Sequence, residues 1–120
     1  MTGWALPTGA LPWKERSARI AIAVLEKHAD QGLPCPTNNQ LQDEGVTSPW
    51  NVVGDLARAG NIVLEMYGRQ RFITILRGPH AGARLGPPGV AEPTYDLYIR
   101  VDDKGRHTYR KRKKNAVRVA

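Results

Sequence analysis

Closely spaced helix boundaries near the middle of the sequence constrain the fold more than any other feature of this chain. The connector GLPCP begins at Gly32, and each residue before one of its prolines is pushed towards extended geometry. Thr37 follows, and with Gln40 three residues later it fits a capping box, in which each side chain satisfies a free N–H at a helix start. A short helix is therefore expected from Thr37 to Glu44, ending at Gly45.

A second boundary opens the segment TSPWNVVGDLARAGNI. Ser48 is a favourable N-cap residue, and Pro49 suits the first turn, where its missing N–H costs nothing. The helix is expected to run to about Ala59, with Gly60 as its C-terminal cap. With the preceding short helix and the glycine-containing turn, it predicts a helix-turn-helix arrangement.

The two faces of this third helix differ in character. Its inward stripe is expected to be Pro49, Val52, Val53, Leu56 and Ala59. Its outward face is expected to hold Trp50, Asn51, Gly54, Asp55 and Arg58. Glycine costs roughly 1 kcal/mol in a helix interior, which makes sense if another group passes very close, such as a bound partner's backbone or the first helix.

A longer helix is expected before this pair. Pro12 can occupy its first turn, and no helix breaker occurs between Pro12 and Gly32. Its apolar side is expected to run through Trp13, Arg16, Ile20, Val24 and Lys27, widened by Ala21 and Leu25. Residues 1–11 are expected to be a flexible arm in which Trp4 and Leu6 can act as anchors.

Two β-branched, apolar runs, NIVLEM and RFITIL, follow the third helix and predict a hairpin. Its strands are expected at Ile62–Met66 and Arg71–Leu76, joined by a tip at Tyr67–Gln70. Gly68 can supply the positive φ that such a tip needs. Because both arms are mainly apolar, one face of the hairpin must lie on the helices.

The remainder of the chain divides by composition. Residues 78–93 are rich in Gly and Pro and predict a linker. Residues 94–120 form a basic extension, in which apolar and polar residues alternate before the plausible turn DDKG, as in a second hairpin. Two strands alone are marginal in water, so this hairpin must dock elsewhere or remain partly formed.

The order of long helix, short helix, turn, third helix and hairpin resembles the winged helix-turn-helix DNA-binding domains, and in detail the N-terminal domain of the LexA repressors. The resemblance covers about residues 13–77. It is carried by the β-arm ending RFITIL and by Gly32, Pro34, Pro36, Thr37, Ser48, Pro49, Val53, Leu56, Gly60 and Ile62. It implies an α+β winged helix over residues 12–77, with three helices and a two-stranded wing. LexA's self-cleaving peptidase domain is not expected in a chain of this length, so autoproteolysis is not carried over.

The charge distribution favours a polyanionic partner. The net charge is +7: residues 1–60 carry five Lys or Arg against six Asp or Glu, whereas residues 61–120 carry thirteen against five. Eight basic residues and no acidic residue fall between positions 104 and 118. Nucleic acid is the most frequent partner of such a pattern, and an anionic membrane surface is the second. Basic tails can also merely aid solubility.

The resemblance implies contacts to DNA from the third helix and the wing. Asn51 can pair bidentately with adenine, and Arg58 can reach guanine or a phosphate. Trp50 either contacts thymine methyls and sugars or folds back onto the second helix. Arg69 suits a wing contact to the backbone or the minor groove. The full candidate set is Thr37, Ser48, Trp50, Asn51, Arg58, Tyr67, Arg69, Arg71, Arg110, Lys111, Arg112, Lys113 and Lys114.

Other classes of site have little support in the sequence. Cys35 is the single cysteine, so neither a disulfide framework nor a cysteine metal site is expected. His28, His80 and His107 show no ligand spacing, and no Gly-rich phosphate loop or nucleophile motif occurs. Catalysis, a metal and a cofactor are therefore not expected. With no signal-peptide pattern and no apolar run of about 20 residues, a soluble, cytoplasmic, nucleoid-associated protein is expected.

The main hypothesis is a sequence-specific regulator of transcription that binds double-stranded DNA, of bacterial or phage type. One alternative is a protein-interaction module, docking for example on RNA polymerase, with non-specific nucleic-acid affinity. Another is RNA binding through the basic C-terminal half. The target sequence, the direction of regulation and the oligomeric state stay open.

Overall fold

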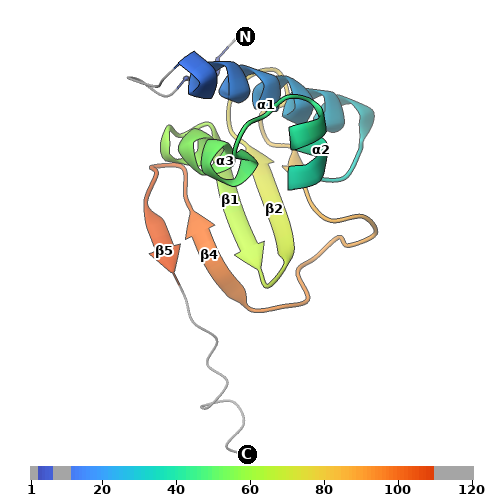
Figure 1. Cartoon of the computed structure of the whole chain (residues 1–120). Helices are drawn as coiled ribbons and strands as arrows, with labels where there is room; N and C mark the ends of the chain where they lie inside the picture. The colour runs from blue at the N-terminus through green and yellow to red at the C-terminus, as the bar shows by residue number, and fades with distance from the viewer. Residues whose placement is uncertain (1–2, 7–11, 110–120) are drawn as a thin grey trace, which may run out of the picture.

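The computed structural model describes residues 3–6 and 12–109, and Figure 1 shows helices gathered on one face of an antiparallel sheet. The described helices are α1 (Pro12–Gln31), α2 (Asn38–Asp43) and α3 (Pro49–Arg58). The described strands are β1 (Ile62–Tyr67), β2 (Gln70–Ile75), β3 (Arg84–Leu85), β4 (Leu97–Val101) and β5 (His107–Tyr109). The sheet order is β3-β2-β1-β4-β5. An α+β domain, as predicted, is confirmed at this level.

The starts of α2 and α3 differ in how they are capped. The Thr37 N–H donates to Gln40 Oε1 at 2.9 Å and the Gln40 N–H donates to Thr37 Oγ1 at 3.1 Å, so the predicted capping box is confirmed. Ser48 occupies the N-cap position of α3 with φ 54°, and its hydroxyl makes no capping hydrogen bond. The expected hydroxyl cap is therefore wrong. The left-handed backbone costs roughly 1–2 kcal/mol in a non-glycine residue, and Pro49 at the first position defines the start of α3.

The core lies between the helices and one face of the sheet. The strand alternation turns the same side of each central strand towards the helices, burying Ile62, Leu64, Ile73, Ile75, Leu85 and Val101. α3 adds Val52, Val53 and Leu56, as predicted. The buried side of α1 is Ser17, Ala18, Ala21, Ile22, Val24 and Leu25. Ala21, Val24 and Leu25 are buried as predicted. The remainder of the predicted side is wrong, because Arg16 and Lys27 are exposed and Ile20 is only half-buried.

The segment predicted as a linker packs against the sheet. β3 falls within it and pairs with β2 through Ile73–Leu85 and Thr74–Arg84. The Cys35 N–H donates to the Gly86 carbonyl at 2.8 Å, which joins the segment to the connector before α2. The segment therefore adds Arg84 and Leu85 to the same sheet, instead of separating two units.

The second hairpin docks on the first. β4 pairs with β1, and β5 pairs with β4, so the β1–β2 hairpin is flanked on both edges. The expected two-stranded hairpin is thus the centre of a larger sheet. Asp102 shapes the β4–β5 turn by accepting hydrogen bonds from the backbone N–H groups of Lys104 and Arg106, at 3.0 and 2.9 Å. Desolvation raises the pKa of the Asp102 carboxyl, but these bonds and the Arg106 guanidinium outweigh it and hold that pKa below its ordinary value.

The described part of the N-terminal arm is anchored. Trp4 is buried and its indole N–H donates to Glu26 Oε2 at 2.9 Å. The Asn61 amide accepts from the Ala5 N–H and donates to the Ala5 carbonyl, both at 2.7 Å. A flexible arm is therefore wrong for residues 3–6, whereas the anchoring role of Trp4 is confirmed. Residues 7–11 lie outside the described part of the chain.

Candidate nucleic-acid interface

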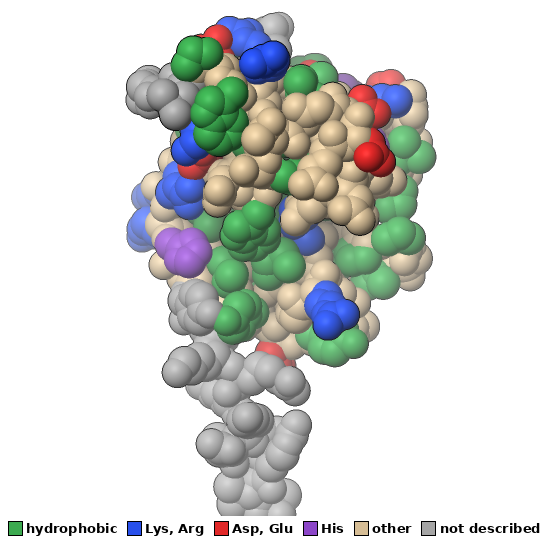
Figure 2. All heavy atoms as spheres, viewed as in Figure 1, with side chains coloured by type: hydrophobic (Ala, Val, Ile, Leu, Met, Phe, Trp, Pro, Cys, Tyr) green, Lys and Arg blue, Asp and Glu red, His purple; other side chains and the backbone are tan. Residues whose placement is uncertain are grey.

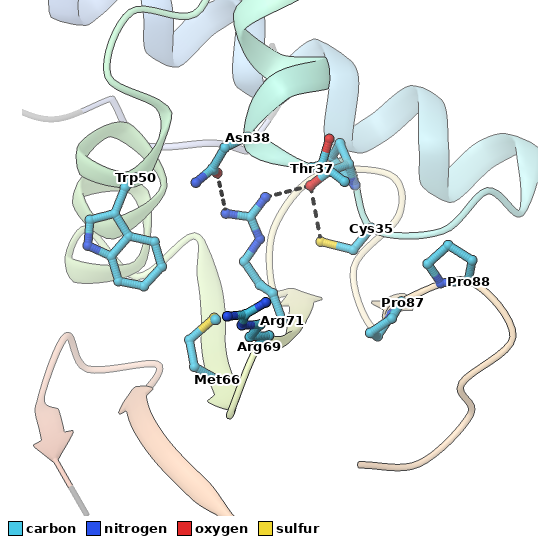
Figure 3. A pocket seen from close by; sticks show the side chains of 10 residues that line it. Cys35, Thr37, Asn38, Trp50, Met66, Arg69, Arg71, Pro87 and Pro88 are labelled. Atoms are coloured by element: carbon cyan, nitrogen blue, oxygen red, sulfur yellow. Dashed lines mark hydrogen bonds between the residues drawn. The ribbon is translucent and has the colours of Figure 1, made fainter. Parts of the chain in front are cut away.

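A groove of about 320 Å³ lies between the start of α2, α3 and the end of the β1–β2 hairpin. Figure 3 shows Trp50 at one end of it and Pro87 and Pro88 at the other. The residues that line the groove are Cys35, Pro36, Thr37, Asn38, Trp50, Met66, Arg69, Arg71, Pro87 and Pro88. The groove thus combines an apolar lining with arginine, asparagine and threonine side chains.

Arg71 connects the sheet to the α2 connector. One guanidinium nitrogen donates to Asn38 Oδ1 at 2.7 Å, and another donates to the Pro36 carbonyl at 2.5 Å (Figure 3). Burial raises the pKa of the neighbouring Cys35 thiol, and the Arg71 charge only partly opposes this shift. Cys35 is therefore a neutral thiol at neutral pH, and Arg71 holds the start of α2 against the β1–β2 hairpin.

Trp50 and Arg69 line the groove and are both exposed to solvent. Trp50 leaves α3 towards the sheet and remains 42% exposed, in the groove that Met66 also lines (Figure 3). Arg69 sits at the hairpin tip, is exposed, and forms no ion pair with any residue that the structure describes. The reading of Trp50 as a core residue is therefore wrong, because the ring lines a groove and stays exposed, whereas its contact with DNA stays a prediction.

The outer face of α3 carries Asn51 and an ordered arginine. Asn51 is exposed. Arg58 donates to Asp55 Oδ1 at 2.5 Å, and Lys14 Nζ lies 3.8 Å from Asp55 Oδ2. Asp55 therefore orients Arg58, as predicted. The group nearest Gly54 is this same guanidinium, because a Cβ at that position would lie 3.4 Å from Arg58 Nη1. The helix surface at Gly54 thus leaves room for Arg58 to reach Asp55.

Tyr67 lies on the opposite face of the sheet from the groove. Its hydroxyl donates to Glu65 Oε2 at 3.0 Å, and its ring meets Phe72 edge-on with centroids 5.6 Å apart. Burial and the Glu65 carboxylate together raise the pKa of the Tyr67 hydroxyl. Arg84 and Arg100 approach the same carboxylate at 3.6 and 3.9 Å. Tyr67 is thus part of a separate polar cluster.

The structure brings together only part of the predicted set. Thr37, Trp50, Arg69 and Arg71 line the groove, whereas Tyr67 faces away from it. Ser48, Asn51 and Arg58 are exposed along α3. The remaining candidates, Arg110, Lys111, Arg112, Lys113 and Lys114, lie outside the described residues.

Asn38 and Met66 line the groove but were missed from the sequence. Asn38 is the first residue of α2. In the sequence it is recognisable only as part of a helix start, and nothing there indicates that it lines a groove. Strand alternation offered a cue for Met66, because it lies two residues after the buried Leu64 and so faces the helices. The apolar character of the groove was therefore not foreseen.

The surface around the groove is mixed in character. Figure 2 shows hydrophobic side chains gathered below α3 and over the strands, with Lys and Arg side chains at the margins of this area. None of the helices in the described ranges is long and apolar enough to cross a membrane. Within residues 3–6 and 12–109, no group of three or more His, Cys, Asp or Glu side chains could hold a metal ion.

The candidate site therefore consists of the exposed face of α3, the adjoining groove and the arginine side chains that line this groove. Comparisons with protein-family models, with curated proteins and with solved structures found no match to this chain.

Proposed function

We propose that the protein is a sequence-specific regulator of transcription of bacterial or phage type that binds double-stranded DNA through a winged-helix arrangement. One observation carries the proposal. Residues from separate segments, Thr37, Trp50 and Arg69, line one groove beside the exposed outer face of α3. The net charge of +7 supports a polyanionic partner for this surface.

In the proposed complex, the outer face of α3 enters the major groove. Asn51, in the first half of α3, meets base edges there, and Arg58 is held ready by Asp55 for a guanine or a phosphate. Arg69 at the hairpin tip neutralises a backbone phosphate. The basic run, defined here as residues 110–114, follows directly after Tyr109 in the sequence. Tyr109 pairs with Ile99 of β4, and β4 is the strand beside β1.

Selection from a random duplex pool at two salt concentrations tests this function. We expect one preferred site at both concentrations, because base contacts select sequence while phosphate contacts change affinity with salt. Overall retention of DNA is expected to fall at the higher salt concentration. Enrichment of no sequence at either concentration would overturn the proposal.

Asn51→Ala is expected to relax base choice at one position of the preferred site. The amide contact contributes about 1–3 kcal/mol of discrimination against the wrong base. The measurement is a comparison of affinities for the preferred site and for its single-base variants. A uniform loss across all positions, with discrimination unchanged, would show that Asn51 reads no base.

Arg69→Ala is expected to weaken binding to every duplex by a similar factor. Removal of one phosphate contact should reduce the slope of log affinity against log salt concentration by about 1. Arg19→Ala is the control, because Arg19 is exposed on α1 and paired with Glu15 at 3.4 Å. An unchanged salt slope in the Arg69 variant would contradict the phosphate contact.

A second candidate function is docking on a protein such as RNA polymerase. It is favoured by the apolar part of the groove, which Met66 lines together with Trp50, itself 42% exposed. A stable partner that co-purifies after nuclease treatment and is lost on Trp50→Ala would support it. Competition between duplex DNA and RNA tests the remaining alternative, RNA binding through the basic C-terminal half.

A further inference from the structure

We infer that the groove seats one unpaired nucleobase, so that the protein prefers DNA in which a single base is free to leave the helical stack. The inference rests on the proposed function, because it assigns the groove beside the same DNA-binding face. Trp50 provides the stacking surface, Asn38 provides a hydrogen-bond donor, and Arg69 provides the positive charge for the adjoining phosphate.

The placement of Trp50 separates it from the duplex-reading face. Successive residues of an α-helix lie about 100° apart around the axis, so Trp50 turns towards the sheet while the neighbouring Asn51 is exposed on α3. The groove of about 320 Å³ is at the lower end of the size of small-molecule sites, roughly 300–1,000 Å³. That volume accommodates a base with its sugar and excludes a duplex. A base must therefore leave the stack to contact Trp50.

The chemistry around the groove suits a flat ring carrying a negative phosphate. An exposed Trp stacks on any base, because every base has a π-face. Met66 lines the same groove and contributes a polarisable thioether (Figure 3). Arg69, which is without an acidic partner among the described residues, can neutralise the phosphate that enters with the base.

Asn38 adds a hydrogen bond to the seated base. Arg71 has only N–H donors, so the atom of Asn38 that it contacts at 2.7 Å must be the carbonyl oxygen. The amide nitrogen then points away from Arg71, to the side on which Trp50 lies (Figure 3). Asn38 is thereby held as a donor towards the groove. It can donate to an acceptor of the seated base, such as a carbonyl oxygen of thymine or a ring nitrogen of adenine.

The experiment compares a fully paired duplex with the same duplex carrying one extra thymine or one extra adenine. We expect about tenfold tighter binding of the thymine-bulged duplex than of the paired one, with quenching of tryptophan fluorescence. The preference and the quenching should both be lost in Trp50→Leu, which keeps an apolar side chain, and partly restored in Trp50→Phe. Trp13→Phe, which lies on α1 and does not line the groove, is the matched control and should keep both.

Asn38→Ala should weaken the binding of both bulged duplexes and leave the affinity for the paired duplex unchanged. The proposed base-binding site would be overturned if bulged and paired duplexes bound with equal affinity and no fluorescence quenching depended on Trp50. Failure to bind any duplex would overturn the proposed function instead. In that case, binding of a short oligothymidylate tests the base-binding site by itself. Quenching by that oligomer in the natural protein but not in Trp50→Leu supports the base-binding site, and its absence in both contradicts it.

Discussion

Gly105→Ala is expected to lower the free energy of unfolding by about 3 kcal/mol. Gly105 has φ +76°, a conformation that costs a residue with a Cβ roughly 1–2 kcal/mol. A Cβ there would also lie 2.6 Å from the Arg58 carbonyl oxygen, so the β4–β5 turn would have to move away from the end of α3. Overpacking of this kind costs about 1–3 kcal/mol more. Equilibrium unfolding in urea measures the change.

Gly89→Ala is the matched control for this substitution. Gly89 has φ +71°, but a Cβ at that position would meet nothing within 4 Å. Its loss of stability should therefore be limited to the backbone cost of roughly 1–2 kcal/mol. Equal losses in the two variants would show that the β4–β5 turn does not press on α3.

Replacement of Arg110, Lys111, Arg112, Lys113 and Lys114 by glutamine is expected to produce the largest change in DNA affinity. Each phosphate contact that is lost reduces the slope of log affinity against log salt concentration by about 0.9, so loss of all of them reduces it by up to about 4.5. The loss of affinity should therefore be greatest at low salt. A salt titration of duplex binding measures the slope.

The control for the basic run replaces exposed cations on α1, Arg19 and Lys27, by glutamine. That variant should keep a slope close to that of the natural protein. Because the run acts through phosphates, the base preferences found by selection should also stay the same without it. Changed base preferences would indicate that the run reads bases, contrary to this expectation.

Local signals were sufficient to predict the helices. The boundaries of α1, α2 and α3 agree with the predictions to within a residue or two, because prolines, glycines and a capping box act over a few positions. The Thr37–Gln40 pair shows this most directly, since both of its hydrogen bonds form. Ser48 shows the limit, because its residue type suited a cap but its left-handed backbone left the hydroxyl without one.

The arrangement of the sheet could not be predicted in the same way. The sequence pattern of β4 and β5 indicated a hairpin, but its pairing with β1 joins residues more than thirty positions apart, as in Leu64–Val101. The register between β1 and β4 depends on the shape of the whole core, and no local sequence motif indicates it. The pairing of β3 within a Gly/Pro-rich segment was missed for the same reason, because a two-residue strand leaves no alternation to recognise.

The groove also depends on long-range contacts. Arg71 was assigned to DNA from its place near the hairpin tip, yet it donates to Pro36, 35 residues earlier in the chain. Tyr67 was grouped with it because the two residues flank the same turn. They belong to opposite faces of the sheet, and a tip expected to begin at Tyr67 could not reveal that the residue still belongs to β1. Whether Arg71 and Tyr67 contact DNA stays a prediction.

The contact between Asn61 and Ala5 has a consequence for the order in which the domain is completed during synthesis. These residues are 56 positions apart, and Asn61 is fully buried while it holds both backbone groups of Ala5. A ribosome releases the N-terminal segment and all of α1 long before Asn61 is available. Trp4 can meet its partner Glu26 as soon as α1 has formed, whereas the backbone of Ala5 gains both of its hydrogen bonds only after the segment that leads into β1 has emerged.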